Sequence, residues 1–106
     1  MIITTTDTIP GRRLVRILGL VKGSTVRSRH IGHDLTAVMK NITGGEIREY
    51  TKLMAESREQ ALDRMREEAT KMGANAVIGV RFITSEIMQN ASELLVYGTA
   101  VLTEEE

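Results

Sequence analysis

The chain has 106 residues, which is enough for one domain and too few for a second sizeable hydrophobic core. Its 14 basic and 14 acidic side chains balance, which argues against a dedicated nucleic-acid-binding protein. It contains no cysteine, so disulfides, thiolate metal sites and thiol nucleophiles are excluded. The N-terminus lacks the features of a signal peptide, and no apolar stretch is long enough to span a bilayer. We therefore expect a soluble cytoplasmic protein without a membrane partner.

The first predicted elements are two strands joined by a turn. Residues 2–5 form a possible short strand, and Pro10-Gly11 supplies the fixed φ and the positive φ that a type II turn requires. Residues 13–21 are rich in Leu, Val and Ile and predict a longer strand. We expect this strand to stop at Lys22-Gly23-Ser24.

Two helices are predicted next. Asp34 can cap a short helix that runs to about residue 42 and ends at Gly44-Gly45. Residues 46–72 lack Gly and Pro and carry an apolar stripe at helical spacing, which predicts a long helix ended by Gly73. The stripe consists of Ile47, Tyr50, Met54, Ala61, Met65, Ala69 and Met72. A capping-box pattern at residues 57–60 allows two helices instead, but the stripe keeps its phase there, which favours one.

The last predicted elements are two strands, residues 76–84 and 94–102. The segment between them is short and mostly polar, which indicates an antiparallel hairpin. The expected order is therefore β-α-α-β-β with an antiparallel sheet, in an α+β domain that covers residues 1–106 and has a possible extra N-terminal strand.

The three main strands carry apolar residues on both faces. Strict alternation predicts the faces Ala76, Ile78, Val80, Phe82 and Val77, Gly79, Ile83 in the first hairpin strand. It predicts the faces Leu94, Val96, Gly98, Ala100, Leu102 and Leu95, Tyr97, Thr99, Val101 in the last strand. It places Val15, Ile17 and Val21 opposite Leu14, Leu18 and Leu20 in the early strand. A sheet with one face in water should alternate apolar with polar residues. Because the helices can cover only one face, we expect further copies of the chain to cover the other.

Several segments resemble the YbjQ family, and the resemblance extends over essentially the whole chain. They are the Gly44-Gly45-Glu46 helix start with Tyr50, the run from Gly73-Ala74-Asn75-Ala76 to Val80, the Tyr97-to-Val101 strand, and the Thr-rich segment before Pro10-Gly11. The resemblance implies a dodecin-like protomer that assembles as a homo-oligomeric ring, with a pentamer expected. The family is also labelled as heavy-metal-binding, so the resemblance raises the question of which residues could bind a metal ion.

The candidate metal ligands are His30, His33 and Asp34. Two His residues three positions apart can converge on one ion if they lie on a helical turn, and Asp34 adds an oxygen ligand. Only two His are present, however, and they lie in residues 1–40, which carry seven basic and two acidic side chains, a net charge of +5. The preferred interpretation is a solvated or inter-subunit histidine pair. A ring that pools ligands from several subunits keeps the metal hypothesis open.

Two further features bear on ligand binding. Gly19, Gly79 and Gly98 lie within strands, where glycine marks close approach of backbone or ligand, and packing is the preferred explanation. A basic cluster suits phosphates and carboxylates but lacks aromatic partners nearby in sequence, and we expect it to pair with acidic residues of a neighbouring subunit. The basic cluster comprises Arg12, Arg13, Arg16, Lys22, Arg27 and Arg29.

No nucleophile has a recognisable base beside it, and no nucleotide-binding motif occurs. The leading hypothesis is an oligomeric assembly or binding module for a small ligand, with a small anion as one candidate. The residues specify neither the identity of the ligand nor a cofactor. A metal-binding protein that uses His30 and His33 is the alternative, and an enzyme with an inter-subunit site ranks third.

Overall fold

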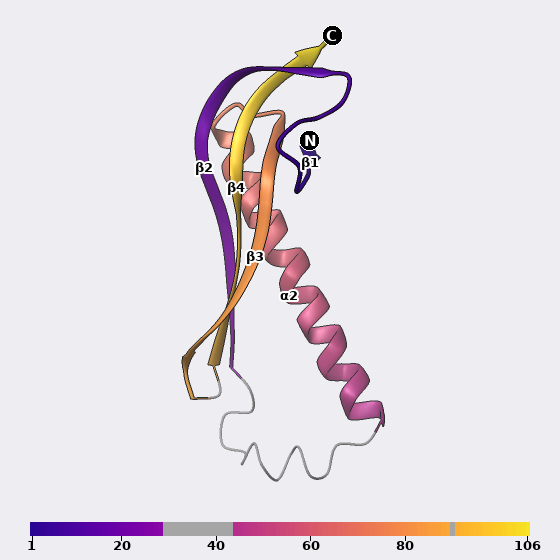
Figure 1. Cartoon of the computed structure of the whole chain (residues 1–106). Coiled ribbons are helices and arrows are strands. Elements are labelled where there is room, and N and C mark those ends of the chain that lie inside the picture. The colour runs from indigo at the N-terminus through magenta and orange to yellow at the C-terminus, as the bar shows by residue number, and fades with distance from the viewer. Residues whose placement is uncertain (29–43, 90) are drawn as a thin grey trace.

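The computed structural model describes residues 1–28, 44–89 and 91–106 and confirms an α+β domain (Figure 1). Its described elements are strand β1 (Ile2–Ile3), strand β2 (Arg12–Ser28), helix α2 (Gly44–Lys71), strand β3 (Ala76–Met88) and strand β4 (Ala91–Glu105). The four strands form one sheet in the order β1-β3-β4-β2. The order β-α-β-β of the main elements fits a dodecin-like protomer. The short helix expected from Asp34 to about residue 42 lies outside the described residues.

The sheet is mixed, whereas the sequence predicts an antiparallel one. β4 is antiparallel to both β2 and β3, as expected. β1 pairs in parallel with β3 through Ile2 opposite Ala76 and Ile3 opposite Val77. The Pro10-Gly11 turn that follows β1 is confirmed, since Gly11 has φ +81° and the Arg12 amide donates to the Ile9 carbonyl at 3.0 Å.

Helix α2 is continuous from Gly44 to Lys71, so the favoured prediction of one long helix is confirmed. Ser57 is not a cap but a mid-helix residue, fully buried where α2 crosses β2. Its carbonyl accepts a hydrogen bond from the Thr25 hydroxyl at 3.4 Å. No helix among the described residues is long and apolar enough to cross a membrane.

Strand β2 does not stop at Lys22-Gly23-Ser24 but continues to Ser28. Gly23 lies directly beneath α2, where a Cβ atom would come within 2.6 Å of the Met65 amide nitrogen and closer still to the Ala61 carbonyl oxygen. The glycine therefore permits close contact between helix and strand rather than a turn. The sequence alone does not distinguish these two uses of glycine.

The hairpin of β3 and β4 is also longer than expected. The ladder extends to Met88 opposite Ala91, so most of residues 85–93, expected as a connection, belong to the strands. Polar side chains are tolerated there because β3 is exposed from Arg81 to its end at Met88, and so is Gln89, which follows it.

Three bulges change the faces predicted for β2 and β3. In β2 they occur between Leu14 and Arg16 and between Ile17 and Gly19. Each bulge adds one residue to the strand, so Leu14, Ile17 and Leu20 lie on the same face at steps of three rather than two. The strict alternation predicted for this strand is wrong for that reason.

The third bulge, between Ile78 and Arg81, has the same effect on β3. It places Val80 on the face of Val77, whereas alternation predicts the face of Ile78. β4 contains no extra residue at these points, and the core face predicted for it is confirmed from Leu94 to Ala100 by the burial of Leu94, Val96, Gly98 and Ala100. The prediction fails at the end of the strand, where Val101 is fully buried and Leu102 is 37% exposed.

The hydrophobic core lies between α2 and one face of the sheet (Figure 1). α2 contributes Ala61, Met65 and Ala69, which belong to the predicted apolar stripe. The sheet contributes Val21, Val77, Val80, Leu94, Val96 and Ala100. We call the opposite side of the sheet the open face, since α2 does not lie over it.

Candidate functional site

The candidate metal ligands His30, His33 and Asp34 lie outside the described residues. Among the side chains of residues 1–27, 51–89 and 91–106, no three His, Asp or Glu groups lie close enough together to hold a metal ion.

The strand glycines contact the chain itself. A Cβ at Gly98 would lie 2.7 Å from a Val77 methyl group and 3.0 Å from the Ile78 carbonyl oxygen, and one at Gly19 would lie 3.3 Å from the Met72 methyl group. Gly79 adopts φ +63° within the β3 bulge, where the extra residue requires a left-handed backbone. All three positions are accounted for by packing and backbone geometry, which is the explanation preferred from the sequence.

The basic cluster is not a compact site, because its members are spread along the length of β2. Arg12 and Arg13 lie at the start of the strand, and Arg27 lies near its other end, where it donates to the Gln60 side chain at 2.6 Å. Arg29 lies outside the described residues. The described members of the basic cluster therefore do not converge on one point of β2.

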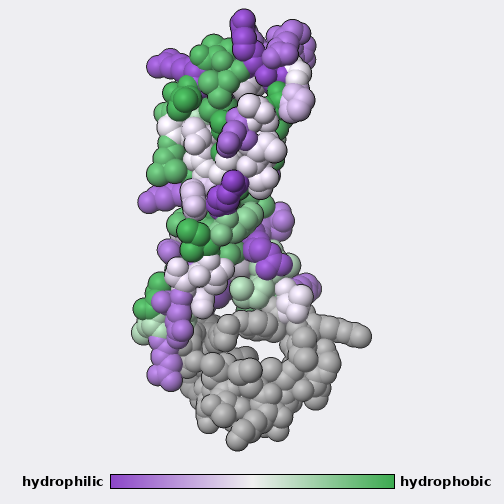
Figure 2. All heavy atoms as spheres, viewed as in Figure 1, coloured by the Kyte–Doolittle hydropathy of each residue, from purple (hydrophilic) through white to green (hydrophobic). Residues whose placement is uncertain are grey.

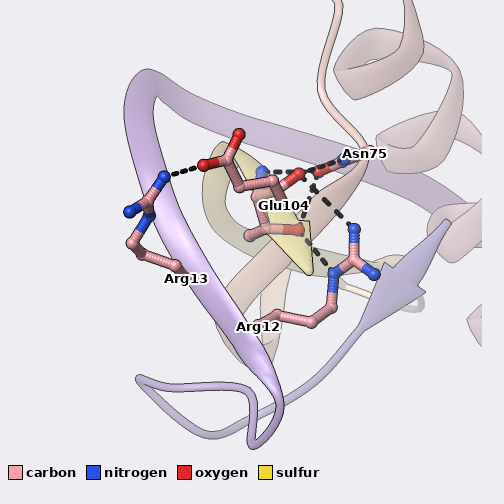
Figure 3. Close-up of polar contacts among 5 residues, drawn as sticks. Arg12, Arg13, Asn75 and Glu104 are labelled. Carbon is pink, nitrogen blue, oxygen red and sulfur yellow. Dashed lines mark hydrogen bonds and ion pairs between the residues drawn. The ribbon is translucent and has the colours of Figure 1, made fainter. Parts of the chain in front are cut away.

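Arg12 and Arg13 belong to a polar network at the end of the sheet (Figure 3). The Arg12 Nε atom donates to the Thr103 hydroxyl at 2.7 Å, and Arg13 forms an ion pair with Glu104. The Asn75 amide donates to the Thr103 carbonyl at 2.7 Å, and its oxygen accepts from the Thr103 amide at 2.8 Å. The Asn75 side chain thus imitates a strand neighbour and holds the end of β4, which assigns a structural role to the Gly-Ala-Asn-Ala segment.

We expect Asn75→Ala to lower the free energy of unfolding by about 1–3 kcal/mol, because it leaves the partly buried Thr103 backbone groups unpaired. Urea unfolding measures this loss. Asn75→Asp is the comparison variant, since it keeps the acceptor at Oδ1 for the Thr103 amide but replaces the donor with a charged oxygen that faces the Thr103 carbonyl. An Asn75→Ala variant as stable as the parent would show that water replaces the amide without cost.

A shallow hollow lies between α2 and the lower part of β2. It is lined by Arg27, Lys52, Ala55, Glu56, Glu59, Gln60 and Asp63. Its lining combines two basic side chains with three acidic ones, so the charges largely offset one another.

The open face is the most unusual surface of the described chain. Leu14, Ile17 and Leu20 are exposed by 43%, 64% and 67%, and all three lie on this face because of the bulges in β2. Tyr97 and Leu95 continue this face on β4, opposite Lys22 and Ser24, and are only half buried. Figure 2 views the molecule from this side, and along the margin formed by β2 hydrophobic residues are interspersed with hydrophilic ones. Polar residues, Lys22, Ser24, Thr99 and Arg81, lie on the same face among these apolar side chains.

The two strands that flank β4, which are β2 and β3, also carry most of the exposed apolar side chains. Of the 14 large hydrophobic residues exposed in the described chain, nine belong to β2 and β3 and one to the central strand β4. The nine are Leu14, Val15, Ile17, Leu20, Val26, Phe82, Ile83, Ile87 and Met88. Sequence reasoning predicted apolar residues on both faces but missed their concentration at the edges, which depends on strand order.

Comparison with known proteins identifies the family. A family model described as "Putative heavy-metal-binding" for YbjQ proteins matches residues 1–104. The chain belongs to the YbjQ family. Similar proteins occur in bacteria and archaea. A UPF0145 protein from Hahella chejuensis is 59% identical over 104 residues, which cover 98% of this chain and all of that protein.

A second relative is similar in sequence, and a solved structure is similar in fold. A UPF0145 protein from Archaeoglobus fulgidus is 56% identical over 101 residues, covering 95% of this YbjQ protein and 94% of the relative. A crystal structure of a protein of unknown function from Pediococcus pentosaceus superposes with a TM-score of 0.65 and 17% sequence identity. The superposition covers 98% of both chains and shows that they share the fold.

Proposed function

We propose that this YbjQ protein works as a homo-oligomeric ring, an assembly or binding module in which neighbouring subunits cover the open face of the sheet. The exposure of Leu14, Ile17 and Leu20 on one face is the observation that carries the proposal. Burying a Leu or Ile side chain contributes about 1.5–3 kcal/mol, so leaving three in water forgoes a large part of a typical domain's stability.

A ring also gives the uneven charge distribution a role. Residues 1–40 carry a net charge of +5, and residues 41–106 carry seven basic and twelve acidic side chains, a net charge of −5. A head-to-tail interface places two different surfaces in contact, so basic β2 can meet acidic residues of the next subunit. The dodecin-like resemblance gives five as the expected number of subunits.

Native mass spectrometry tests the proposal on protein purified without chelator or affinity metal. The expected spectrum contains one closed oligomer of defined subunit number, with any retained small ligand visible as added mass. A monomer at micromolar concentration, confirmed by light scattering, would refute the assembly.

A metal-binding protein is the second candidate, favoured by the description of the matching family model. His30 and His33 are the side chains that would contribute ligands, one or two from each subunit of a ring. The same spectra decide this question. Retained zinc, copper or nickel that disappears in the variant with His30→Ala and His33→Ala would establish the metal function. An enzyme with an inter-subunit site ranks third, since no described residues form a catalytic arrangement that we can recognise.

A further inference from the structure

One row of side chains crosses the open face through the middle of the sheet. Tyr97 on β4 pairs with Lys22 on β2 and with Arg81 on β3, so these three side chains lie on the same face in direct register. Neighbouring strands are about 4.8 Å apart, which places the two cationic residues roughly 10 Å from each other with the tyrosine between them. Lys22 and Arg81 are exposed, and Tyr97 is half buried. The row therefore presents two positive charges on either side of a hydroxyl group that can donate a hydrogen bond.

These two positive charges have no counter-charge in the described chain. Neither Lys22 nor Arg81 belongs to the ion pairs that the described side chains form. The Asp7 carboxylate lies near the bulge of β3, 3.7 Å from the position that a Cβ atom of Gly79 would take, but it is not paired with Arg81. On the open face itself, the next acidic residue of β4 is Glu93, roughly 13 Å from the tyrosine along the strand. A partner for the two cations must therefore come from elsewhere.

Arg81 is held in a way that leaves its binding edge free. Its Nη1 atom donates to the Thr5 carbonyl at 3.0 Å and to the Val80 carbonyl at 2.8 Å. The Nε and Nη2 atoms have no hydrogen-bond partner among the described residues, and these two nitrogens form the fork with which arginine binds an oxyanion. Because one end of the guanidinium is already fixed, less conformational entropy is lost when the other end binds a ligand.

We propose that the row formed by Lys22, Tyr97 and Arg81 binds the phosphate group of a small organic phosphate. This inference rests on the binding module proposed above and names the class of its ligand. A tetrahedral dianion suits two cations that approach from opposite sides of a hydroxyl group, whereas a carboxylate carries one charge and lies in one plane. The half-buried hydroxyl groups of Ser24 and Thr99 lie on the same face in the neighbouring rows and offer further donors.

The surroundings of the row favour an organic ligand over free phosphate. Leu20 and Ile83 are exposed by 67% and 44%, and Leu95 is half buried beside them. These side chains offer apolar contacts to the organic part of a ligand whose phosphate group lies between Lys22 and Arg81. Coverage of the open face by neighbouring subunits adds to the need for an anion, since a charge that leaves water without a partner is costly.

Isothermal titration calorimetry on the whole chain tests the site with two probes, phenyl phosphate and inorganic phosphate. At about pH 7.5, above the second pKa of about 6, the phosphate group carries nearly two negative charges. We expect one site per subunit and tighter binding of phenyl phosphate than of inorganic phosphate. Lys22→Gln, Tyr97→Phe and Arg81→Lys should each weaken phenyl phosphate binding about tenfold or more, because each removes a hydrogen bond to a charged ligand. Arg81→Lys keeps the positive charge and removes only the fork.

Arg58→Gln is the matched control, since it removes an exposed positive charge from α2 and should bind like the parent. Circular dichroism checks that each variant is folded. If Arg58→Gln weakens binding as much as Lys22→Gln does, the ligand responds to general positive charge and the site is overturned. Inorganic phosphate that binds as tightly as phenyl phosphate would overturn the assignment to an organic phosphate.

The failure of the site and the failure of the assembly are distinguishable. A parent that is oligomeric by native mass spectrometry but binds neither probe would overturn the site, leave the oligomer standing and assign the two cations to acidic residues of a neighbouring copy. A monomeric parent that binds phenyl phosphate, and loses this binding in Lys22→Gln, would support the site and refute the assembly.

Discussion

Val96→Asp is expected to unfold the chain, whereas Leu95→Asp is expected to leave the subunit folded and break the assembly. The two residues are neighbours on β4 and point to opposite faces. Val96 is fully buried in the core beneath α2, while Leu95 is half buried on the open face between Ser24 and Ile83. An unpaired carboxylate at Val96 costs several kcal/mol, about as much as the whole stability of many domains of this size.

Circular dichroism and light scattering distinguish the two results. The Val96 variant should lose its cooperative thermal transition, and the Leu95 variant should keep its secondary structure but dissociate or precipitate. Val96→Ala and Leu95→Ala are the matched controls, since they shorten the side chains without adding charge. A Leu95→Asp oligomer of parent mass and heat stability would contradict the proposed burial of the open face.

Gly23→Ala is expected to be the most damaging single-methyl substitution in the described chain. The added Cβ would lie 2.6 Å from the Met65 amide nitrogen and 3.1 Å from the Arg64 Cβ, and these atoms belong to the helix itself. Because backbone cannot rotate away as a side chain can, α2 must move off β2. We expect a loss at the upper end of the ~1–3 kcal/mol typical of overpacking, or beyond it.

Urea unfolding measures this loss. Lys22→Ala, at the exposed neighbouring position, is the control for changes in strand propensity, and it should alter the free energy of unfolding by less than about 0.5 kcal/mol. If Gly23→Ala proves as stable as Lys22→Ala, the contact between α2 and β2 adjusts more easily than its distances indicate.

The elements governed by local patterns could be predicted from the sequence. The stripe from Met54 to Ala69 predicted one helix, Pro10-Gly11 predicted the turn, and the strict alternation in β4 predicted its buried face correctly from Leu94 to Ala100. These features depend on neighbours within a few residues. The prediction failed where distant parts of the chain decide the outcome.

Gly23 illustrates that limit, because the atoms that require a glycine there belong to Ala61 and Met65. The bulges are a second case. They reassign Ile17 and Val80 to faces that alternation does not predict, and only pairing with β4 reveals the extra residues. The parallel pairing of Ile2 with Ala76 has no local signature either. Of the candidate sites, the metal ligands stay a prediction, and the apolar open face emerged once the strand order was known.

The position of β4 also has a consequence for biosynthesis. β4 lies between β2 and β3 in the sheet, but it is the last of the three to be made, and Ser28 pairs with Ala91 while Arg12 pairs with Glu105. At about 5–20 residues per second, β2 waits roughly 3–20 s on the ribosome before its partner is complete. Its apolar residues are exposed to other nascent chains during that time. The five positive charges along β2 then act as a temporary safeguard, since they keep the unpaired strand from associating with copies of itself.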